Sequence, residues 1–210
     1  MAWFTRFTRF GDIHFVFGQE LGNTCGPSAA LMCYTKLMKL SPGAKLFGNS
    51  NQMELWYQEW YGKPYDGTKE GTWPEGLVYA LNKSGCGRWR CDKYSPVDAT
   101  DAIDKFVGTT SGVVGPTVNC TPVIVGVNWD GSTASHWVCI DTVREVMGLK
   151  FATICDPWDA NVHVQHITVG QPFVYMAKQE QRVDLWGTHF EYNQPSTGRV
   201  KDWPIIHLVD

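Results

Sequence analysis

The first half of the chain has the hydrophobic spacing of helices. Between positions 29 and 38, apolar side chains recur at intervals of three and four residues, which predicts a helix with one buried face. Thr24 is suited to cap this helix, and Pro27 to its first turn, where a missing N–H costs little. Ser95 is a suitable cap for a later helix. Three further helices are expected, at 51–60, 74–82 and 96–106.

The second half has the pattern of strands. Its apolar runs are rich in β-branched residues and are bounded by Pro, Asp or Gly, as strands usually are. A short strand, Phe15–Phe17, is also expected near the N-terminus. Helices followed by antiparallel strands predict an α+β fold. The strands expected in the second half are 122–127, 137–143, 151–155, 162–169, 173–176 and 205–209.

We expect a single domain over 1–210, because this length suits one hydrophobic core. Its helical half would cover about 20–107 and its β half about 120–210, joined by the Gly- and Thr-rich stretch Gly108–Thr121. The first ten residues include three phenylalanines and two arginines. We expect this segment to pack on the domain rather than to bind a membrane or a partner.

Composition narrows the classes of function. Hydrophobic residues make up 43% of the chain and charged residues 19%, which predicts a packed core and not disorder. The net charge of −3 argues against nucleic-acid binding. The sequence contains no apolar stretch of about 18 residues, so it predicts no membrane-spanning helix. The first residues lack the apolar core of a signal peptide. We expect a monomer that is cytoplasmic or is secreted by a route independent of a signal peptide.

The seven cysteines, an odd number without a secretory signal, predict mainly free thiols in a reducing compartment. The sequence has no C-x-x-C pair, and Cys86 and Cys91 have no matching Cys or His pair downstream. It also lacks the His-Glu-x-x-His pattern of metal-dependent hydrolases. We therefore expect neither a metal nor a cofactor.

Cys25 is the thiol whose position favours reactivity. It lies where a loop enters the first predicted helix, so it faces the positive end of the helix dipole and unpaired backbone N–H groups. Both favour the nucleophilic thiolate, and such N–H groups can also donate to an oxyanion. Cys33, two turns later, has neither advantage. The alternative for Cys25 is a small buried side chain.

A cysteine nucleophile needs a base, and the base needs an orienting group. His136 is the candidate base, because it follows a run of small residues and opens a predicted strand. Asp156 ends the next predicted strand and is the candidate orienting acid, with Asp159 as a rival. Gln19 shortly precedes Cys25 and has an amide that can donate to an oxyanion. The alternative for His136 is a polar residue at a solvated strand end. The alternative for Asp156 is an Asp-Pro turn, and the alternative for Gln19 is an ordinary loop residue.

Three short blocks together resemble papain-like cysteine peptidases. The closest similarity is to the C39-like branch and to the related AvrRpt2-type bacterial effector proteases. The resemblance implies a papain-like fold, in which a helical half packs on an antiparallel sheet. The blocks are Gln19 with Asn23–Leu31, Ser135–Val138 and Cys155–Trp158. The roles of nucleophile, general base and acid, orienting acid and oxyanion donor would fall to Cys25, His136, Asp156 and Gln19.

The sequence also departs from these families. Gly-Pro follows Cys25 where papain has an aromatic residue, so papain's substrate preference is not transferred. The chain from Cys25 to His136 is longer than in a minimal C39-like domain, which predicts an insertion in the helical half. The segment Gln181–Asp210 has no counterpart in the resemblance.

Two tryptophans flank the candidate catalytic residues. Trp137 follows His136, and Trp158 lies just after Asp156. We expect their rings to line a groove between the two halves, in which an extended peptide binds. The alternative is that both are ordinary core residues.

These features predict a cysteine peptidase that hydrolyses peptide or isopeptide bonds in a protein or peptide substrate, with a bacterial secreted effector as one setting. An amidase, a deamidase or a transglutaminase-like acyl transferase would use the same site. A third alternative is a non-catalytic interaction domain with the same fold. Its contact residues would be tryptophans, such as Trp56, Trp60, Trp73 and Trp158.

Overall fold

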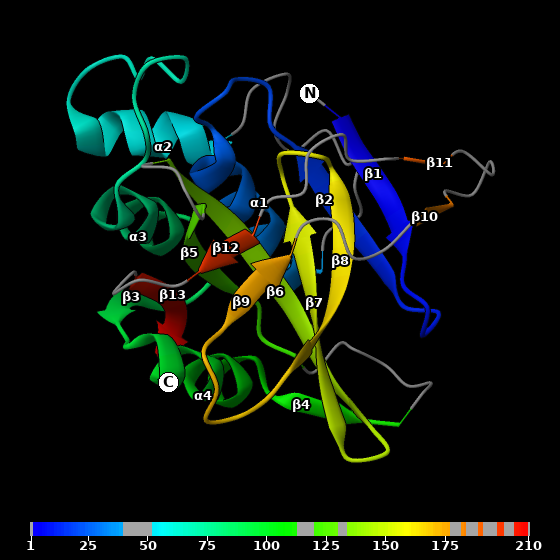
Figure 1. Ribbon diagram of the computed structural model, residues 1–210. Coiled ribbons are helices and arrows are strands. Elements are labelled where there is room, and N and C mark those ends of the chain that lie inside the picture. The colour runs from blue at the N-terminus through cyan, green and yellow to red at the C-terminus, as the bar shows by residue number, and fades with distance from the viewer. Residues whose placement is uncertain are drawn as a thin grey trace.

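The computed structural model shows an α+β fold, which confirms the predicted fold class (Figure 1). Within the residues it describes, four helices accompany a sheet that is antiparallel except for one short strand. The described residues are 2–39, 52–112, 120–129, 134–176, 182–183, 189–190, 197–199 and 204–209.

The helices follow the predicted ones closely. They are α1 (Cys25–Leu37), α2 (Gln52–Tyr61), α3 (Pro74–Lys83) and α4 (Pro96–Val107). Ser95 caps α4 as predicted, because its Oγ accepts a hydrogen bond from the backbone N–H of Asp98 at 3.2 Å. The side-chain cap predicted for Thr24 is wrong: its Oγ1 bonds to the Leu21 backbone and not to α1. None of the helices in the described ranges is long and apolar enough to cross a membrane.

The strands predicted for the second half are present, and several extend beyond their predicted ends. They are β5 (Val123–Trp129), β6 (Ser135–Val146), β7 (Leu149–Asp156), β8 (Asn161–Ile167), β9 (Val174–Met176) and β13 (Pro204–Val209). The main sheet has the strand order β3-β13-β5-β6-β7-β8, in which β3 is Arg88–Lys93. β12 (Thr197–Arg199) joins β9 to β5. Two further short strands, β10 (Arg182–Val183) and β11 (His189–Phe190), pair with each other.

Three strands of the first half were not predicted. The N-terminal segment forms β1 (Ala2–Phe7), which pairs with β2 (Ile13–Gly18) in a hairpin and so packs on the domain as expected. β3 (Arg88–Lys93) lies in the predicted helical half but pairs with β13 at the sheet edge. β3 lacks the apolar run by which the other strands were predicted, because charged residues alternate along it. Such charges are common on edge strands. β4 (Thr109–Ser111) pairs with β6 in parallel, and positions 113–119 of the expected linker lie outside the described residues.

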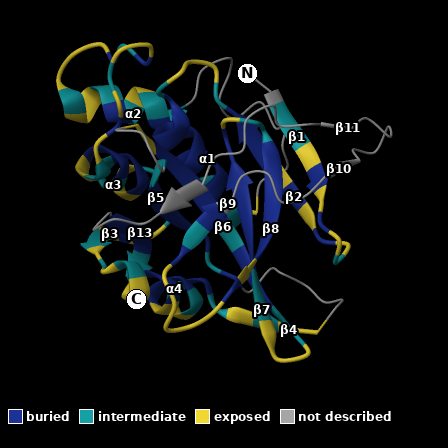
Figure 2. Cartoon of the chain, in the orientation of Figure 1, coloured by how far each residue is buried: buried dark blue, intermediate teal, exposed yellow. Residues whose placement is uncertain are grey.

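Two buried clusters divide the side chains of the sheet between its faces. On β6, Trp137 and Cys139 join the cluster that includes α1, α2 and α3. Val138 and Ile140 join the cluster that includes α4. This sorting follows from the strand geometry, in which successive side chains point to opposite faces. Figure 2 shows α1 and the central strands as the most buried part of the chain.

A buried ion pair fixes the N-terminal hairpin to the main sheet. Arg144 of β6 donates from Nε and Nη2 to the carboxylate of Asp12, at 3.2 and 2.6 Å. Its Nη1 donates to the carbonyl of Gly112 at 2.9 Å. Asp12 lies between β1 and β2, and β2 leads directly to Gln19 and Cys25. The ion pair therefore helps to position the loop that precedes Cys25.

Asp12→Ala will lower the free energy of unfolding by about 3–5 kcal/mol, because it removes the carboxylate that compensates a buried guanidinium. Urea denaturation measures the loss. Glu59→Ala is the matched control: its carboxylate pairs with Lys83 on the surface, where an ion pair contributes little. Equal stability of the two variants would contradict the anchoring role of Asp12.

Candidate active site

Cys25, His136 and Asp156 meet where α1 begins and where two neighbouring strands have adjacent ends. His136 is the second residue of β6, and Asp156 is the last residue of β7. These strands are antiparallel, with Cys139 opposite Cys155, so the start of β6 lies beside the end of β7. His136 Nε2 lies 2.7 Å from Asp156 Oδ1. The Cys25 thiol lies close enough to the same imidazole to contribute to its raised pKa. The structure thus brings the three residues together.

The first turn of α1 is closely packed around Cys25, which is only 6% exposed. A Cβ atom at Gly26 would lie 2.1 Å from Oγ1 and 3.0 Å from Cβ of Thr72, so this position has room only for glycine. The preceding loop is held by a hydrogen bond from the Asn23 N–H to the Gly67 carbonyl at 2.8 Å. Because the Thr24 side chain does not cap the helix, it leaves the first-turn N–H groups to other acceptors.

The carboxylate of Asp156 is buried and accepts three hydrogen bonds. Oδ1 accepts from His136 Nε2 and from the backbone N–H of Trp158, both at 2.7 Å. Oδ2 accepts from the Tyr175 hydroxyl at 2.5 Å. Since Nε2 of His136 is directed to Asp156, Nδ1 is the ring nitrogen that remains for the thiol. The carboxylate therefore sets the orientation of the imidazole, as an orienting acid must.

Two aromatic residues that sequence reasoning missed complete the surroundings of His136. The ring of Trp129, the last residue of β5, stacks on the imidazole with centroids 5.5 Å apart and an interplanar angle of 19°. Trp129 also contacts Tyr175, with a centroid distance of 5.9 Å. The β5–β6 pairing places Val127 opposite His136. Trp129 follows Val127 by two residues, so an antiparallel pairing of the two predicted strands could have placed Trp129 near His136. No sequence signal indicated the contact made by the Tyr175 hydroxyl.

The charges of His136 and Asp156 stabilise each other. Burial alone would lower the pKa of His136, but the charge and hydrogen bond of Asp156, with a smaller contribution from Cys25, raise it to about 10. Burial alone would raise the pKa of Asp156, but the charge and hydrogen bond of His136 lower it below the ordinary range. At neutral pH the pair is therefore an imidazolium and a carboxylate.

Gln19 lies between the Cys25 loop and the turn that follows Asp156. Its backbone N–H donates to the carbonyl of Pro157 at 2.8 Å. Its side-chain Nε2 donates to the carbonyls of Leu21 and Gly22, at 2.9 and 3.1 Å. The structure therefore places Gln19 beside the site, but its amide donors are directed to the loop itself.

The two tryptophans next to the candidate catalytic residues differ in exposure. Trp158 is 53% exposed and can contact a bound molecule. Trp137 is 2% exposed, belongs to the core and donates from Nε1 to the Thr72 carbonyl at 3.2 Å. The prediction that Trp137 lines a groove is therefore wrong, because a buried ring has no accessible face. Its position on β6 directs it into the core beneath α1.

Asp159, the rival orienting acid, binds a different histidine. Its Oδ2 lies 2.7 Å from His163 Nε2, and its Oδ1 accepts from the backbone N–H of Asn161 at 2.9 Å. Burial raises the pKa of Asp159, and the negative charge of Asp156 adds to this effect. Asp159 thus takes no direct part in the contact between His136 and Asp156.

Two groups of side chains among the described residues have the composition of metal ligands. In each group, one potential ligand atom per residue lies within 4.8 Å of the others. The carboxylates already accept hydrogen bonds, from His163 in one group and from Lys36 in the other. We therefore assign a metal to neither. The groups are Asp156 with Asp159 and His163, and His14 with Asp141 and Cys155.

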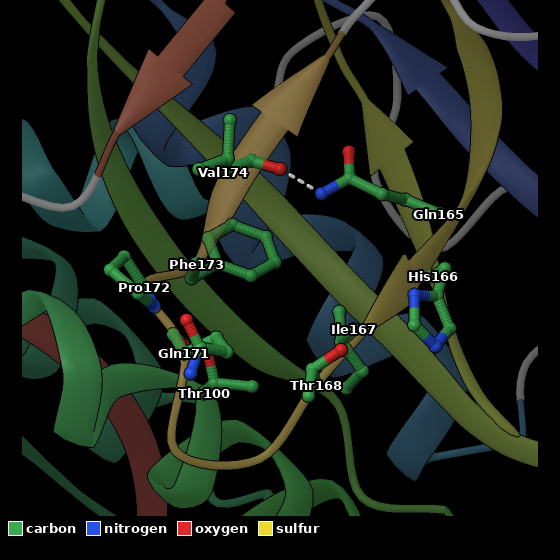
Figure 3. A pocket seen from close by; sticks show the side chains of 9 residues that line it. All are labelled: Thr100, Gln165, His166, Ile167, Thr168, Gln171, Pro172, Phe173 and Val174. Carbon is green, nitrogen blue, oxygen red and sulfur yellow. Dashed lines mark hydrogen bonds between the residues drawn. The ribbon is translucent and has the colours of Figure 1, made fainter.

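A pocket of about 290 Å³ opens between α4 and the β8–β9 connection, and its lining contains none of Cys25, His136 or Asp156 (Figure 3). Thr100, His166 and Phe173 are among its lining residues. The Gln165 amide crosses one end of the pocket and donates to the Val174 carbonyl. The lining mixes polar and apolar groups without a charged pair or a nucleophile, so we assign it no chemistry.

Comparison of the chain with models of known protein families and with curated proteins gave no match. A function therefore has to follow from the geometry of the site. That geometry is a thiol at a helix start, an imidazole paired with a carboxylate, and two further hydrogen bonds to that carboxylate.

In an NMR titration of the imidazoles, His136 will stay protonated well above pH 7 and will lose its proton near pH 10. Asp156→Asn will lower the pKa of His136 toward the ordinary value of about 6.5, because it removes the negative charge that favours the imidazolium. Asp159→Asn is the matched control and will have a smaller effect. A His136 that titrates near pH 6.5 in the parent protein would contradict the buried charge pair.

Proposed function

We propose that this protein is a papain-like thiol hydrolase that cleaves peptide or isopeptide bonds in a protein or peptide substrate. The observation that carries the proposal is the convergence of the Cys25 thiol, the His136 imidazole and the Asp156 carboxylate at one end of the sheet. Other buried histidine–aspartate contacts occur in the structure, but among the described residues His136 is the one beside a thiol at a helix start. A nucleophile, its proton carrier and an orienting acid require this arrangement.

The bond-making and bond-breaking steps use Cys25 and His136. An imidazolium beside a thiol favours the thiolate, and the sulfur of Cys25 attacks the carbonyl carbon of the substrate. The carbonyl oxygen becomes an oxyanion. As the C–N bond breaks, His136 donates its proton to the leaving amine and an acyl-thiol intermediate remains. Water then attacks this acyl group, gives a proton to His136 and releases a carboxylic acid and the thiolate.

The oxyanion needs hydrogen-bond donors near Cys25. The backbone N–H of Cys25 is one, because N–H groups at a helix start have no partner within the helix. Gln19 is the second, and its Nε2 must exchange the Leu21 or the Gly22 carbonyl for the substrate oxygen. Such an exchange keeps the number of hydrogen bonds constant, so its cost is small.

The placement of the three residues supports a papain-like fold. The nucleophile begins a helix, while the base and the orienting acid lie on adjacent antiparallel strands. The α2, α3 and α4 helices and the β3 strand all lie between Cys25 and His136 in the chain, in agreement with the proposed insertion. Trp158 is exposed two residues after Asp156 and supports a substrate-binding surface on that side.

Cys25 will be the first of the seven thiols to react with iodoacetamide in the native protein, because of its helix-start position and its imidazole partner. Limited labelling followed by mass mapping identifies the modified thiol. Cys33 is the internal control, because it lies on the same helix without a histidine partner and is fully buried. Labelling of Cys86 or Cys91 before Cys25 would overturn the proposal.

Incubation with a peptide library and mapping of new termini will detect cleavage, and Cys25→Ala and His136→Ala will abolish it. Cys33→Ala will keep it. Release of ammonia from Gln or Asn side chains without new termini would instead assign a deamidase to the same site. An unreactive Cys25 with neither product would leave a binding role for the fold.

Gln19→Ala and Tyr175→Phe will each reduce turnover without abolishing it. Loss of one oxyanion donor typically costs a factor of roughly 10²–10³ in rate, and the backbone donor remains. Tyr175→Phe leaves the two other hydrogen bonds of Asp156 in place, so its effect will be smaller. Steady-state kinetics on the library-derived substrate tests both variants. A Gln19→Ala enzyme with full activity would show that Gln19 is only a loop residue.

A further inference from the structure

Two buried thiols face each other between α1 and β6. Cys33 is 0% exposed and Cys139 is 1% exposed, and their sulfur atoms are 3.5 Å apart. A disulfide requires about 2.05 Å between the sulfurs, so the two side chains must turn toward each other for the bond to form. All seven cysteines are free thiols in the structure, so this contact is between two reduced groups.

The pair connects the two elements that carry the nucleophile and the base of the proposed site. Cys33 lies two turns after Cys25 on α1, and Cys139 follows His136 by three residues on β6. A bond between the sulfurs would close a loop between positions that are 106 residues apart. Such a bond would fix α1 on the sheet at a point close to the site.

We propose that Cys33 and Cys139 are an oxidation site that forms an intramolecular disulfide when the chain folds in the presence of a small-molecule disulfide such as oxidised glutathione. The thiolate of one cysteine attacks a sulfur of oxidised glutathione, and one glutathione thiolate leaves. The second cysteine loses its proton and attacks the protein sulfur of this mixed disulfide, and the second glutathione leaves. Two protein thiols are oxidised, and one glutathione disulfide is reduced to two glutathione thiols.

The surroundings of the pair determine when this reaction occurs. Neither sulfur is reachable from solvent in the folded protein. The hydrogen bond to Cys33 and burial also raise the pKa of Cys139, which keeps its reactive thiolate scarce. The bond therefore forms as the chain folds in an oxidising medium, before packing closes over the two thiols. In the folded, reduced protein the pair resists oxidation.

Two of the other thiols have partners of their own, while Cys155 lies opposite Cys139 on β7 and is the competing partner that a peptide map distinguishes. Cys25 contacts His136, while Cys120 lies 3.4 Å from the Gly108 carbonyl and 3.5 Å from the Thr110 hydroxyl. Folding brings Cys33 and Cys139 against each other, which gives them a high effective concentration for reaction.

The test uses the full-length chain with Cys25→Ala, so that the reactive active-site thiol takes no part. The protein is refolded in mixtures of reduced and oxidised glutathione, the remaining thiols are alkylated, and peptides are mapped without reduction. We expect a peptide that links Cys33 to Cys139 as the main cross-linked species. We also expect the thermal midpoint to rise by about 5 °C or more and to return after reduction, because a disulfide that closes a long loop is strongly stabilising.

The controls are Cys33→Ala, Cys139→Ala and Cys86→Ala in the same background. The first two will lose both the cross-link and the rise in thermal midpoint, and Cys86→Ala will keep both. A different dominant pairing, or no cross-link in a parent chain that refolds with native circular dichroism, would overturn the proposal. If either Cys33→Ala or Cys139→Ala fails to fold, the peptide map of the parent and the other variant decide. None of these readouts depends on peptidase activity.

Discussion

The carboxylate of Asp156 is the group on which the rest of the site depends. It is buried, it carries a negative charge, and it accepts hydrogen bonds from His136, Trp158 and Tyr175. A buried charge is tolerated only when it is paired and hydrogen-bonded. Asp156 meets this condition by fixing three separate segments: the start of β6, the turn after β7 and the β9 strand. These hydrogen bonds orient the imidazole and hold the three segments together at one end of the sheet.

Strand register and helix position together create this arrangement. The antiparallel pairing of β6 with β7 brings the start of one strand to the end of the other, so that His136 and Asp156 meet although twenty residues separate them. The α1 helix packs on β6 and presents Cys25 at the same end. On the other side, the ion pair between Arg144 and Asp12 positions the hairpin that leads into the Cys25 loop. The strand register, the packing of α1 and the ion pair each act on one part of the chain. Together they place the three candidate catalytic groups at the same end of the sheet.

Much of this could be predicted from the sequence. Hydrophobic spacing located all four helices of the described chain, and β-branched runs located the central strands. Cys25, His136 and Asp156 each lie at the end of a predicted element, so their proximity could be predicted from the expected topology. What escaped prediction depended on contacts between distant segments. Charged β3 needs β13 to become a strand, the Tyr175 hydroxyl needs a fold to reach Asp156, and the burial of Trp137 depends on the face of β6 that α1 covers.

The tight contact at Gly26 bears on how substitution patterns near such a site are interpreted. Any side chain at this position would collide with Thr72, whose backbone carbonyl in turn receives the Trp137 indole. A larger residue at Gly26 would therefore require Thr72 to move, which is a demand of space and not of reactivity. Two neighbouring positions such as Cys25 and Gly26 can thus be restricted for separate reasons. One is restricted by the chemical group that it supplies, and the other by the lack of space around it.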